Sequence, residues 1–176
     1  MTPHFPFQKS STDASVQIVT GGPDTRPNPV HKALFAAFTR AKKRIVIATP
    51  YLAQDLALRD ALKTAALSGA EVHIVTRPFP PNSYLVYYCG QNYIEEFLAV
   101  GIRVSVYTPG MMHAESVVID GEWALIGTAN LDNRSMFLGF EQMAICFVSL
   151  SLLLIRSHKQ GRQFSYRTLG VVSSGQ

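Results

Sequence analysis

Short apolar segments alternate along the chain with longer segments whose apolar residues recur at helical spacing. The short segments have the pattern of buried strands and span residues 16–19, 45–48, 72–75 and 102–107. The longer segments predict helices over residues 30–43, 55–68 and 84–100. Strands that alternate with helices in this way favour an α/β fold with a largely parallel sheet flanked by helices on both faces.

The pattern changes beyond residue 110. Residues 116–119 and 123–127 each have the apolar character of a strand, and no helical segment separates them. Asp120 and Gly121 stand between them, and Asp-Gly is a strong signal for the tight turn of a hairpin. We therefore expect two antiparallel strands joined at this turn.

Candidate chemical groups gather around the open end of this hairpin. His113 stands just ahead of the first strand, while Thr128 and Asn130 follow the second. A hairpin folds these two segments back beside each other, and Glu141 on a later predicted strand could reach the same cluster. A lone histidine is usually structural, but this one has the polar neighbours that acid–base or nucleophilic chemistry uses.

Length and composition indicate one domain with polar ends. The 176 residues are 47% hydrophobic, which suffices for one sizeable core. We expect a disordered leader over residues 1–15, a folded domain over residues 16–148 and an atypical basic tail over residues 149–176. The net charge of +4 lies wholly in that tail, so the neutral body gives little reason to expect a polyanionic partner.

An apolar run over residues 143–155, interrupted by serines, is too short to span a bilayer. We expect a core strand over residues 142–148 with a loose extension, and the alternative is an interfacial anchor formed with the basic tail. No secretory signal is recognisable, which predicts a cytoplasmic chain, free or peripheral on the inner membrane, without a transmembrane segment. Cys89 and Cys146 fit neither a disulfide framework nor a zinc site.

The segment HAESVVIDGEWALIGTAN, followed by LDNRSMFLGFE, resembles the signature of the phospholipase D superfamily. That signature reads His-x-Lys-x4-Asp-x6-Gly-Ser-x-Asn, with a glutamate further on. Thr128 replaces the serine, and the other matching places are held by His113, Asp120, Gly127, Asn130 and Glu141. Flanking segments such as RIVIATPYL and YIEEFLAVGIRVSVYTPGMMHA are similar to the second half of bacterial cardiolipin synthases. The resemblance covers about residues 16–148 and implies a phospholipase D-like mixed, largely parallel sheet.

Three departures from the family pattern bear on activity. The motif lysine is Glu115, which reverses the charge that would neutralise phosphoryl oxygens. Family members carry two motif copies in one chain or pair two chains, whereas this sequence has one copy. After Val148 the family usually continues with acidic residues and a closing helix, and SLSLLLIRSHKQGRQFSYRTLGVVSSGQ has neither pattern. A shifted reading frame would produce such a change.

The resemblance implies a mechanism without metal or cofactor. One motif histidine attacks phosphorus to form a phosphohistidine, and the histidine of the other copy protonates the departing alkoxide. By this resemblance His113 is one of the pair, Glu141 orients its imidazole, and Asn130 with Thr128 holds phosphoryl oxygens. Asp120 is interpreted as structural. The implied substrate is a phosphatidylglycerol-like phospholipid, and the implied partner is the missing first-motif half or a second copy of the chain.

Glu115 would repel a phosphodiester unless it is protonated or turns towards a cation such as Arg134. We therefore predict a cardiolipin synthase-like phosphatidyltransferase half-site that is weak or inactive alone. Two alternatives stay open. One is a single-motif homodimeric phosphodiesterase or nuclease, in which two copies of His113 meet, and the other is a non-catalytic fragment that binds lipid phosphate. No specific nucleic acid is expected, because nuclease surfaces usually collect basic residues and this body is neutral.

Overall fold

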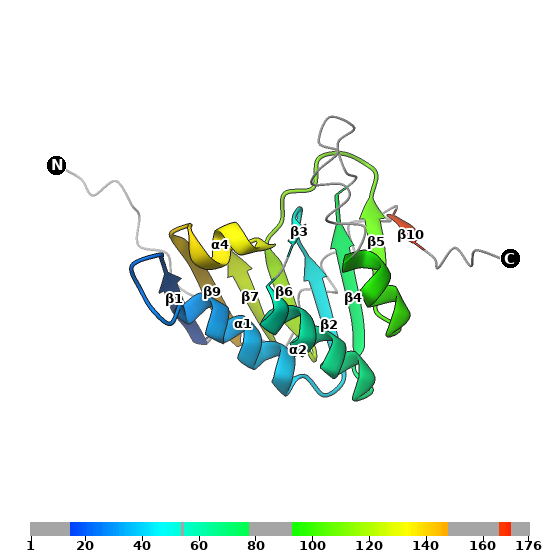
Figure 1. The fold of residues 1–176 in the computed structure, drawn as a ribbon, viewed down its shortest axis with the longest axis horizontal. Coiled ribbons are helices and arrows are strands. Elements are labelled where there is room, and N and C mark those ends of the chain that lie inside the picture. Colours follow the sequence, from blue (N-terminus) through cyan, green and yellow to red (C-terminus); the bar gives the residue numbers. More distant parts are fainter. Residues whose placement is uncertain (1–14, 54, 78–92, 148–165, 170–176) are drawn as a thin grey trace, which may run out of the picture.

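A computed structural model describes residues 15–53, 55–77, 93–147 and 166–169, which form one large sheet with helices packed on it (Figure 1). The described strands are β1 (Ser15–Gly21), β2 (Arg44–Ala48), β3 (Leu52–Ala53), β4 (Glu71–Thr76), β5 (Arg103–Tyr107), β6 (Ser116–Ile119), β7 (Trp123–Gly127), β8 (Leu131–Asp132), β9 (Glu141–Phe147) and β10 (Tyr166–Leu169). The described helices are α1 (Pro29–Arg40), α2 (Leu56–Leu67) and α4 (Asn133–Phe137), and residues 93–99 are helical as well.

Local sequence signals explain where the two long helices begin and end. Asn28 caps α1, because its side-chain oxygen accepts a hydrogen bond from the backbone N–H of Val30 at 2.9 Å. Asp55 caps α2 in the same way through the N–H of Leu58. Gly69 follows α2 with a φ of 99°, a left-handed conformation that glycine adopts without strain. These helices confirm the helical spacing seen in the sequence.

Strand directions divide the sheet into two parts. Its order is β1-β9-β7-β6-β2-β4-β5-β10, and pairing is parallel between β2 and β4 and between β4 and β5. All other neighbours in this sheet are antiparallel. The predicted mixed α/β class is confirmed, but the expectation of a largely parallel sheet is wrong. Parallel pairing needs a helical crossover, and the turn between β6 and β7 is too short to contain one.

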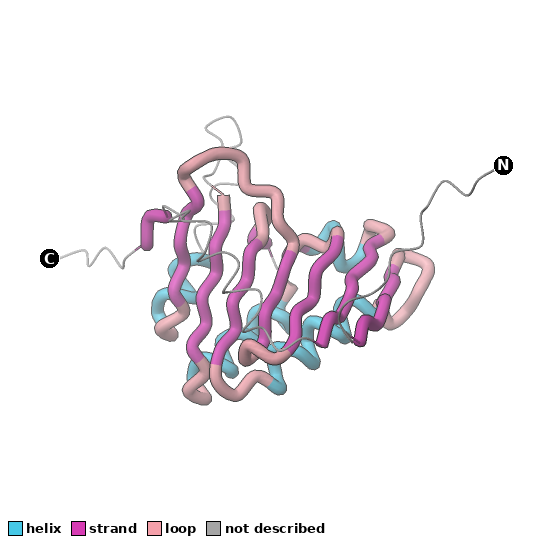
Figure 2. The backbone as a smooth tube through the Cα atoms, turned by 180° about the vertical axis from the view of Figure 1, so that it is seen from behind, coloured by secondary structure: helices cyan, strands magenta, loops and turns pink. Residues whose placement is uncertain are grey.

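The described helices lie on one face of the sheet. In Figure 1, α1, α2 and the helix at residues 93–99 stand in front of the strands, and in Figure 2 the strands face the viewer with the helices behind them. The expectation of helices on both faces is therefore not met within the described residues. On the other face, alternate residues of the antiparallel part stay exposed, namely Val16, Ile18 and Ile126 at 54%, 55% and 48%.

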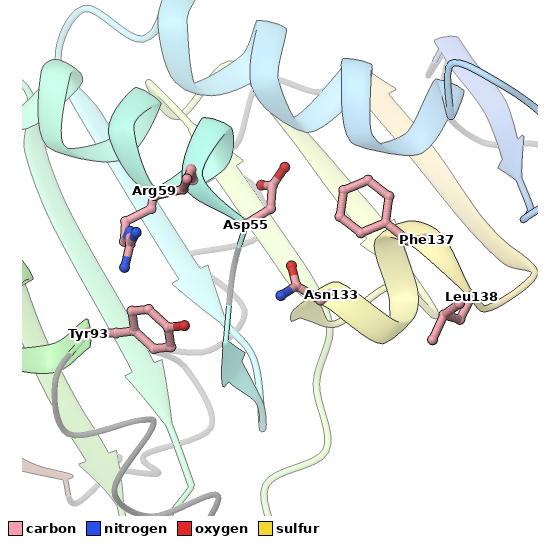
Figure 3. A pocket seen from close by; sticks show the side chains of 7 residues that line it. Asp55, Arg59, Tyr93, Asn133, Phe137 and Leu138 are labelled. Carbon is pink, nitrogen blue, oxygen red and sulfur yellow. The ribbon is translucent and has the colours of Figure 1, made fainter.

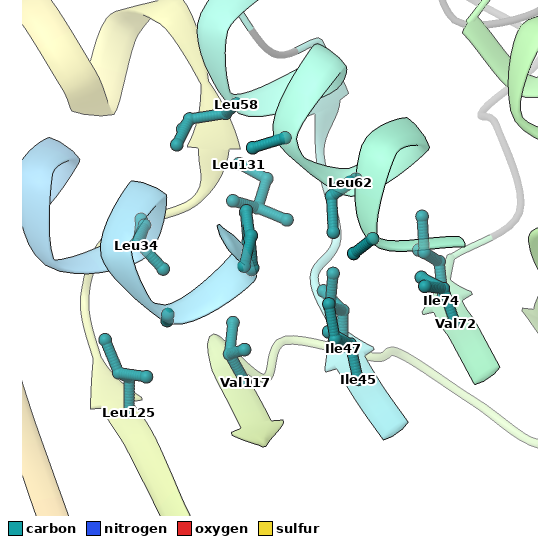
Figure 4. Packing of buried hydrophobic residues seen from close by; sticks show 14 of the residues in the cluster. Leu34, Ile45, Ile47, Leu58, Leu62, Val72, Ile74, Val117, Leu125 and Leu131 are labelled. Atoms are coloured by element: carbon teal, nitrogen blue, oxygen red, sulfur yellow. The ribbon is translucent and has the colours of Figure 1, made fainter. Parts of the chain in front are cut away.

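The core lies between the sheet and these helices (Figure 4). Ile45 and Ile47 of β2 and Ile74 of β4 point from the centre of the sheet towards Leu58 and Leu62 of α2, and each of these side chains is fully buried. Alternation along each strand places one set of side chains in this layer, which fixes the strand register. This packing fixes the positions of the ends of β2, β6 and β7 relative to one another.

Several expectations fall partly or wholly outside the described residues. These are the leader up to residue 14, the start of the helix predicted over residues 84–100, and most of the tail. β9 confirms the core strand predicted around residues 142–148, while the extension beyond residue 147 is not described until β10. β10 pairs with β5, and the proposed boundary at residue 148 stays a prediction. Among the described residues, no helix is long and apolar enough to cross a membrane.

Candidate functional site

The predicted hairpin is present and joins β6 to β7 in antiparallel register. Asp120 and Gly121 both have positive φ angles, 55° and 73°, as the tight turns that favour Asp-Gly require. The backbone N–H of Glu122 closes the turn on the carbonyl of Ile119 at 3.0 Å. The motif residues are thereby distributed over two ends of one hairpin, with Asp120 at the turn and His113 before the opposite end.

Asp120 anchors the turn to a distant segment of the chain. Its carboxylate accepts backbone N–H bonds from Lys42, Lys43 and Arg44 at 2.9, 2.8 and 2.8 Å. Burial raises the pKa of Asp120, but these backbone donors and the charge of Lys43 outweigh burial and hold the pKa below its ordinary value. Its contacts bind the turn to the start of β2, and they fit the structural interpretation of this motif position.

Gly127 permits a close approach at the opposite end of the hairpin. A Cβ atom at this position would lie 2.0 Å from the carbonyl oxygen of Gln142 and 2.8 Å from Cα of Met143. Both contacts are to the backbone of β9, which cannot move aside cheaply. The motif glycine therefore lets β9 bring Glu141 beside the residues that follow β7.

His113 and Glu115 lie together just before β6. Oε1 of Glu115 is 3.0 Å from Nδ1 of His113, yet it lies outside hydrogen-bonding geometry, so the contact is an electrostatic approach. The Glu115 side chain is 10% exposed, whereas His113 is 59% exposed. Glu115 pairs with His113, and among the described residues it forms no ion pair with Arg134, the cation suggested from the sequence.

Thr128 and Glu141 form a second pair at the same end. The Thr128 hydroxyl donates to Oε2 of Glu141 and accepts the N–H of Gln142 at 3.0 Å. The predicted role of Glu141, to orient the imidazole of His113, stays a prediction, and in this arrangement the carboxylate beside His113 is that of Glu115. A carboxylate therefore does lie beside His113, but it belongs to Glu115, two residues away in the sequence, and not to Glu141.

Asn130 is held by its backbone, while its side-chain oxygen has no partner among the described residues. The backbone N–H of Asn130 donates to the Ser135 hydroxyl at 3.1 Å, and that of Leu131 donates to the Thr49 hydroxyl at 3.3 Å. Oδ1 of Asn130 is buried without a hydrogen bond. The loop after β7 is thus fixed to α4 and to Thr49, the residue that follows β2, and the amide oxygen of Asn130 stays available for a ligand.

Sequence reasoning missed a second polar pair, formed by His31 and Asp55. Nε2 of His31 lies 2.7 Å from Oδ2 of Asp55, and the His31 ring contacts the Phe137 ring with centroids 5.8 Å apart. The pair joins α1 to the start of α2. The sequence placed Asp55 only at the start of a predicted helix, because the contact with His31 arises from the packing of two helices.

A pocket of about 510 Å³ adjoins this pair (Figure 3). It is lined by Asp55, Leu56, Arg59, Tyr93, Asn133, Phe137 and Leu138. The Arg59 guanidinium lies over the Tyr93 ring, 4.9 Å from its centroid, and pairs with Glu96. Asn133, which lines the pocket, is three residues beyond Asn130 in the sequence. Among the described residues, there is no group of three or more histidine, cysteine or acidic side chains that could hold a metal ion.

Comparison with known sequences identifies similar proteins. A family model described as "Cardiolipin synthase, PLD-like domain" matches residues 34–155. A cardiolipin synthase from Geobacillus kaustophilus is 36% identical over 167 residues, covering 93% of this chain and 32% of the relative. Major cardiolipin synthase ClsA from Bacillus subtilis is 36% identical over 168 residues, covering 93% and 35%. The chain thus spans about a third of the length of these curated relatives.

Solved structures with the same fold were also found. Phosphatidylserine synthase from Haemophilus influenzae superposes with a TM-score of 0.73 at 22% identity, covering 89% of this chain and 40% of that one. A phospholipase D family member, Nuc, from Salmonella typhimurium superposes with a TM-score of 0.69 at 19% identity, covering 90% and 99%. At these identities the likeness establishes the fold and leaves the chemistry to the site residues.

Proposed function

Because the chain belongs to the family of cardiolipin synthase, phospholipase D-like domains, we propose that it supplies one half of a phosphatidyltransferase site. The half corresponds to the second motif of a cardiolipin synthase. Its substrate is a phosphatidylglycerol-like phospholipid, bound from the surface of a membrane. The reaction is a phosphodiester exchange through a phosphohistidine, in which His113 is the nucleophile or the proton donor.

One observation supports this proposal, namely that His113, Thr128 and Asn130 all belong to the open end of the β6–β7 hairpin. Glu115 lies opposite Gly127 across the hairpin, since the N–H of Gly127 donates to the carbonyl of Glu115 at 3.1 Å. Thr128 and Asn130 follow directly. An exposed imidazole at the same end of a hairpin as hydroxyl and amide groups suits attack on a phosphodiester and contact with its oxygens.

The carboxylate of Glu115 limits what this half-site can do with an anionic phosphodiester. The family's lysine would attract the phosphoryl oxygens, whereas the carboxylate repels them, and burial to 10% exposure reduces screening by water. With one motif histidine and a reversed charge, the chain alone is expected to be weak or inactive.

A second candidate, a homodimeric single-motif phosphodiesterase, receives support from one comparison. The superposition on Nuc covers 99% of the solved Nuc chain. The Nuc chain therefore contains a single copy of the fold. Two copies of this chain related by a two-fold axis would then supply two His113 side chains.

Reconstitution tests the proposal and separates the two candidates. The full chain is mixed with the first-motif portion of a bacterial cardiolipin synthase, and cardiolipin formation from phosphatidylglycerol vesicles is followed together with the mass in solution. We expect no transfer by the chain alone, transfer by a complex of the two parts, and loss of transfer in His113→Ala. His73→Gln, a histidine substitution outside the motif, serves as the matched control.

Two outcomes would change the assignment. Transfer by the chain alone, accompanied by a dimeric mass, would favour the homodimer. Full activity of the reconstituted His113→Ala complex would remove His113 from the reaction and with it the proposed site.

A further inference from the structure

Two buried oxygen atoms of the motif lack hydrogen-bond donors among the described residues. Oε1 of Glu115 and Oδ1 of Asn130 are both buried, and neither accepts a hydrogen bond from a described residue. A buried acceptor without a donor costs free energy, and the cost is larger for a charged group. Most buried polar atoms in proteins are paired, so two unpaired acceptors within one motif mark a place where a ligand can donate.

The two acceptors belong to the same end of the hairpin. Residue 115 lies opposite Gly127, through the bond from the Gly127 N–H to the Glu115 carbonyl, and Asn130 is three residues beyond Gly127. The His113 ring does not satisfy Glu115, because its Nδ1 approaches at 3.0 Å outside hydrogen-bonding geometry. Thr128 is already committed to Glu141 and Gln142. The missing donor must therefore come from outside this cluster.

The charge of the cluster defines the kind of donor that fits. A lysine at position 115 would attract an anionic oxygen, whereas a carboxylate attracts a cation with N–H groups. A primary ammonium offers three such donors, so one group can donate to more than one acceptor at this end of the hairpin.

We infer that the Glu115 and Asn130 oxygens bind an ammonium group, so that this half-site takes a phosphodiester lipid whose headgroup carries a primary amine. The inference rests on the proposed function, because it assumes that His113 faces the phosphodiester. It adds a substrate class that a cluster with lysine at position 115 would disfavour. The ammonium replaces the positive charge that the family's lysine would have supplied.

Three soluble headgroup phosphodiesters test this inference on the full chain. Glycerophosphoethanolamine carries an ammonium with N–H donors, glycerophosphocholine carries the charge without donors, and glycerophosphoglycerol carries neither. Binding is measured by calorimetric titration. We expect glycerophosphoethanolamine to bind roughly tenfold more tightly than glycerophosphoglycerol, the scale of one charge-assisted hydrogen bond, with glycerophosphocholine closer to the weaker ligand.

Substitutions identify the group responsible. Glu115→Gln should lower the affinity for glycerophosphoethanolamine to that for glycerophosphoglycerol, whereas Glu115→Asp, which keeps the charge, should retain part of the preference. Glu122→Gln is the matched control, because Glu122 is a carboxylate with 69% exposure at the turn end of the same hairpin. Melting temperatures of all variants establish that each is folded.

The possible outcomes separate the inference from the proposed function. If none of the three compounds binds, the phosphodiester site itself fails. If all three bind with equal affinity, or if Glu115→Gln weakens them equally, the phosphodiester site stands and the ammonium subsite is wrong.

Discussion

The two ends of the β6–β7 hairpin carry the same chemical group in opposite states. At the turn, the Asp120 carboxylate accepts three backbone N–H bonds. At the open end, the Glu115 side chain is almost as deeply enclosed as a core residue, yet its Oε1 lies 3.0 Å from Nδ1 of His113 and accepts no hydrogen bond from any described residue. The comparison shows that two carboxylates of one motif can have different roles, depending on whether backbone donors are close to them. One with its donors supplied holds the fold, and one without them stays available for binding and chemistry.

The largest effect is expected from reversing the charge at the open end. In a complex with a first-motif half, Glu115→Lys should raise the turnover of phosphatidylglycerol by about 100-fold or more, because attraction replaces repulsion at the phosphoryl oxygens. The rate of cardiolipin formation measures the gain, and adding His113→Ala should abolish it. If neither substitution changes turnover or affinity for vanadate, the open end is a structural relic and only the fold is retained.

A methyl group at the open end should disturb the approach of β9. Gly127→Ala places Cβ against backbone atoms of Gln142 and Met143, and the required shift should lower the free energy of unfolding by about 3 kcal/mol. Denaturant titration measures this loss. Gly110→Ala is the control, because nothing lies within 4 Å of its Cβ, and an equal loss in both variants would contradict the steric reason.

Removing the charge at the turn should have a smaller effect on stability. Asp120→Asn places an N–H₂ group among N–H donors, and we expect a loss of about 1.5 kcal/mol after allowing for solvent screening. Thermal unfolding compares it with Glu122→Gln, which should stay within about 0.5 kcal/mol of the unchanged chain. Equal stability of Asp120→Asn and the unchanged chain would contradict the anchoring role.

The smallest effect should appear as a pH dependence of that anchoring. The pKa of Asp120 is lower in the folded chain than the value of about 3.9 expected in the unfolded chain. Its stabilising contribution is therefore fully present above that value and is lost as the pH falls towards the folded pKa. The difference in unfolding free energy between the unchanged chain and Asp120→Asn should shrink below about pH 4. A difference that stays constant down to pH 2 would exclude the ionised carboxylate as its source.

Local features of the fold were predictable from the sequence. The dipeptide Asp120-Gly121 predicted the hairpin turn, because glycine, asparagine and aspartate are the residues that best tolerate positive φ angles. Helical spacing over residues 55–68 indicated the extent of α2, which spans Leu56–Leu67. Each of these signals is carried by residues that are close in sequence, so no knowledge of tertiary packing was needed.

Strand direction and side-chain partners were not predictable in the same way. β1 pairs with β9, from the other end of the described domain, and no local signal specifies that partner or its antiparallel direction. Motif spacing suggested that His113, Thr128 and Glu141 gather, but it left open which carboxylate adjoins the imidazole. That choice depends on differences of a few ångströms, which the packing of β7 against β9 decides.

The pairing of β1 with β9 has a consequence for the order in which the chain folds. Ser15 faces Phe147 and Gly21 faces Glu141, so the earliest described strand is synthesised long before its partner emerges from the ribosome. Until then, Val16 and Ile18 belong to a strand with unpaired backbone groups on both sides. Nascent chains that stall before residue 141 should consequently be prone to self-association through this strand, and rapid completion of β9 protects them.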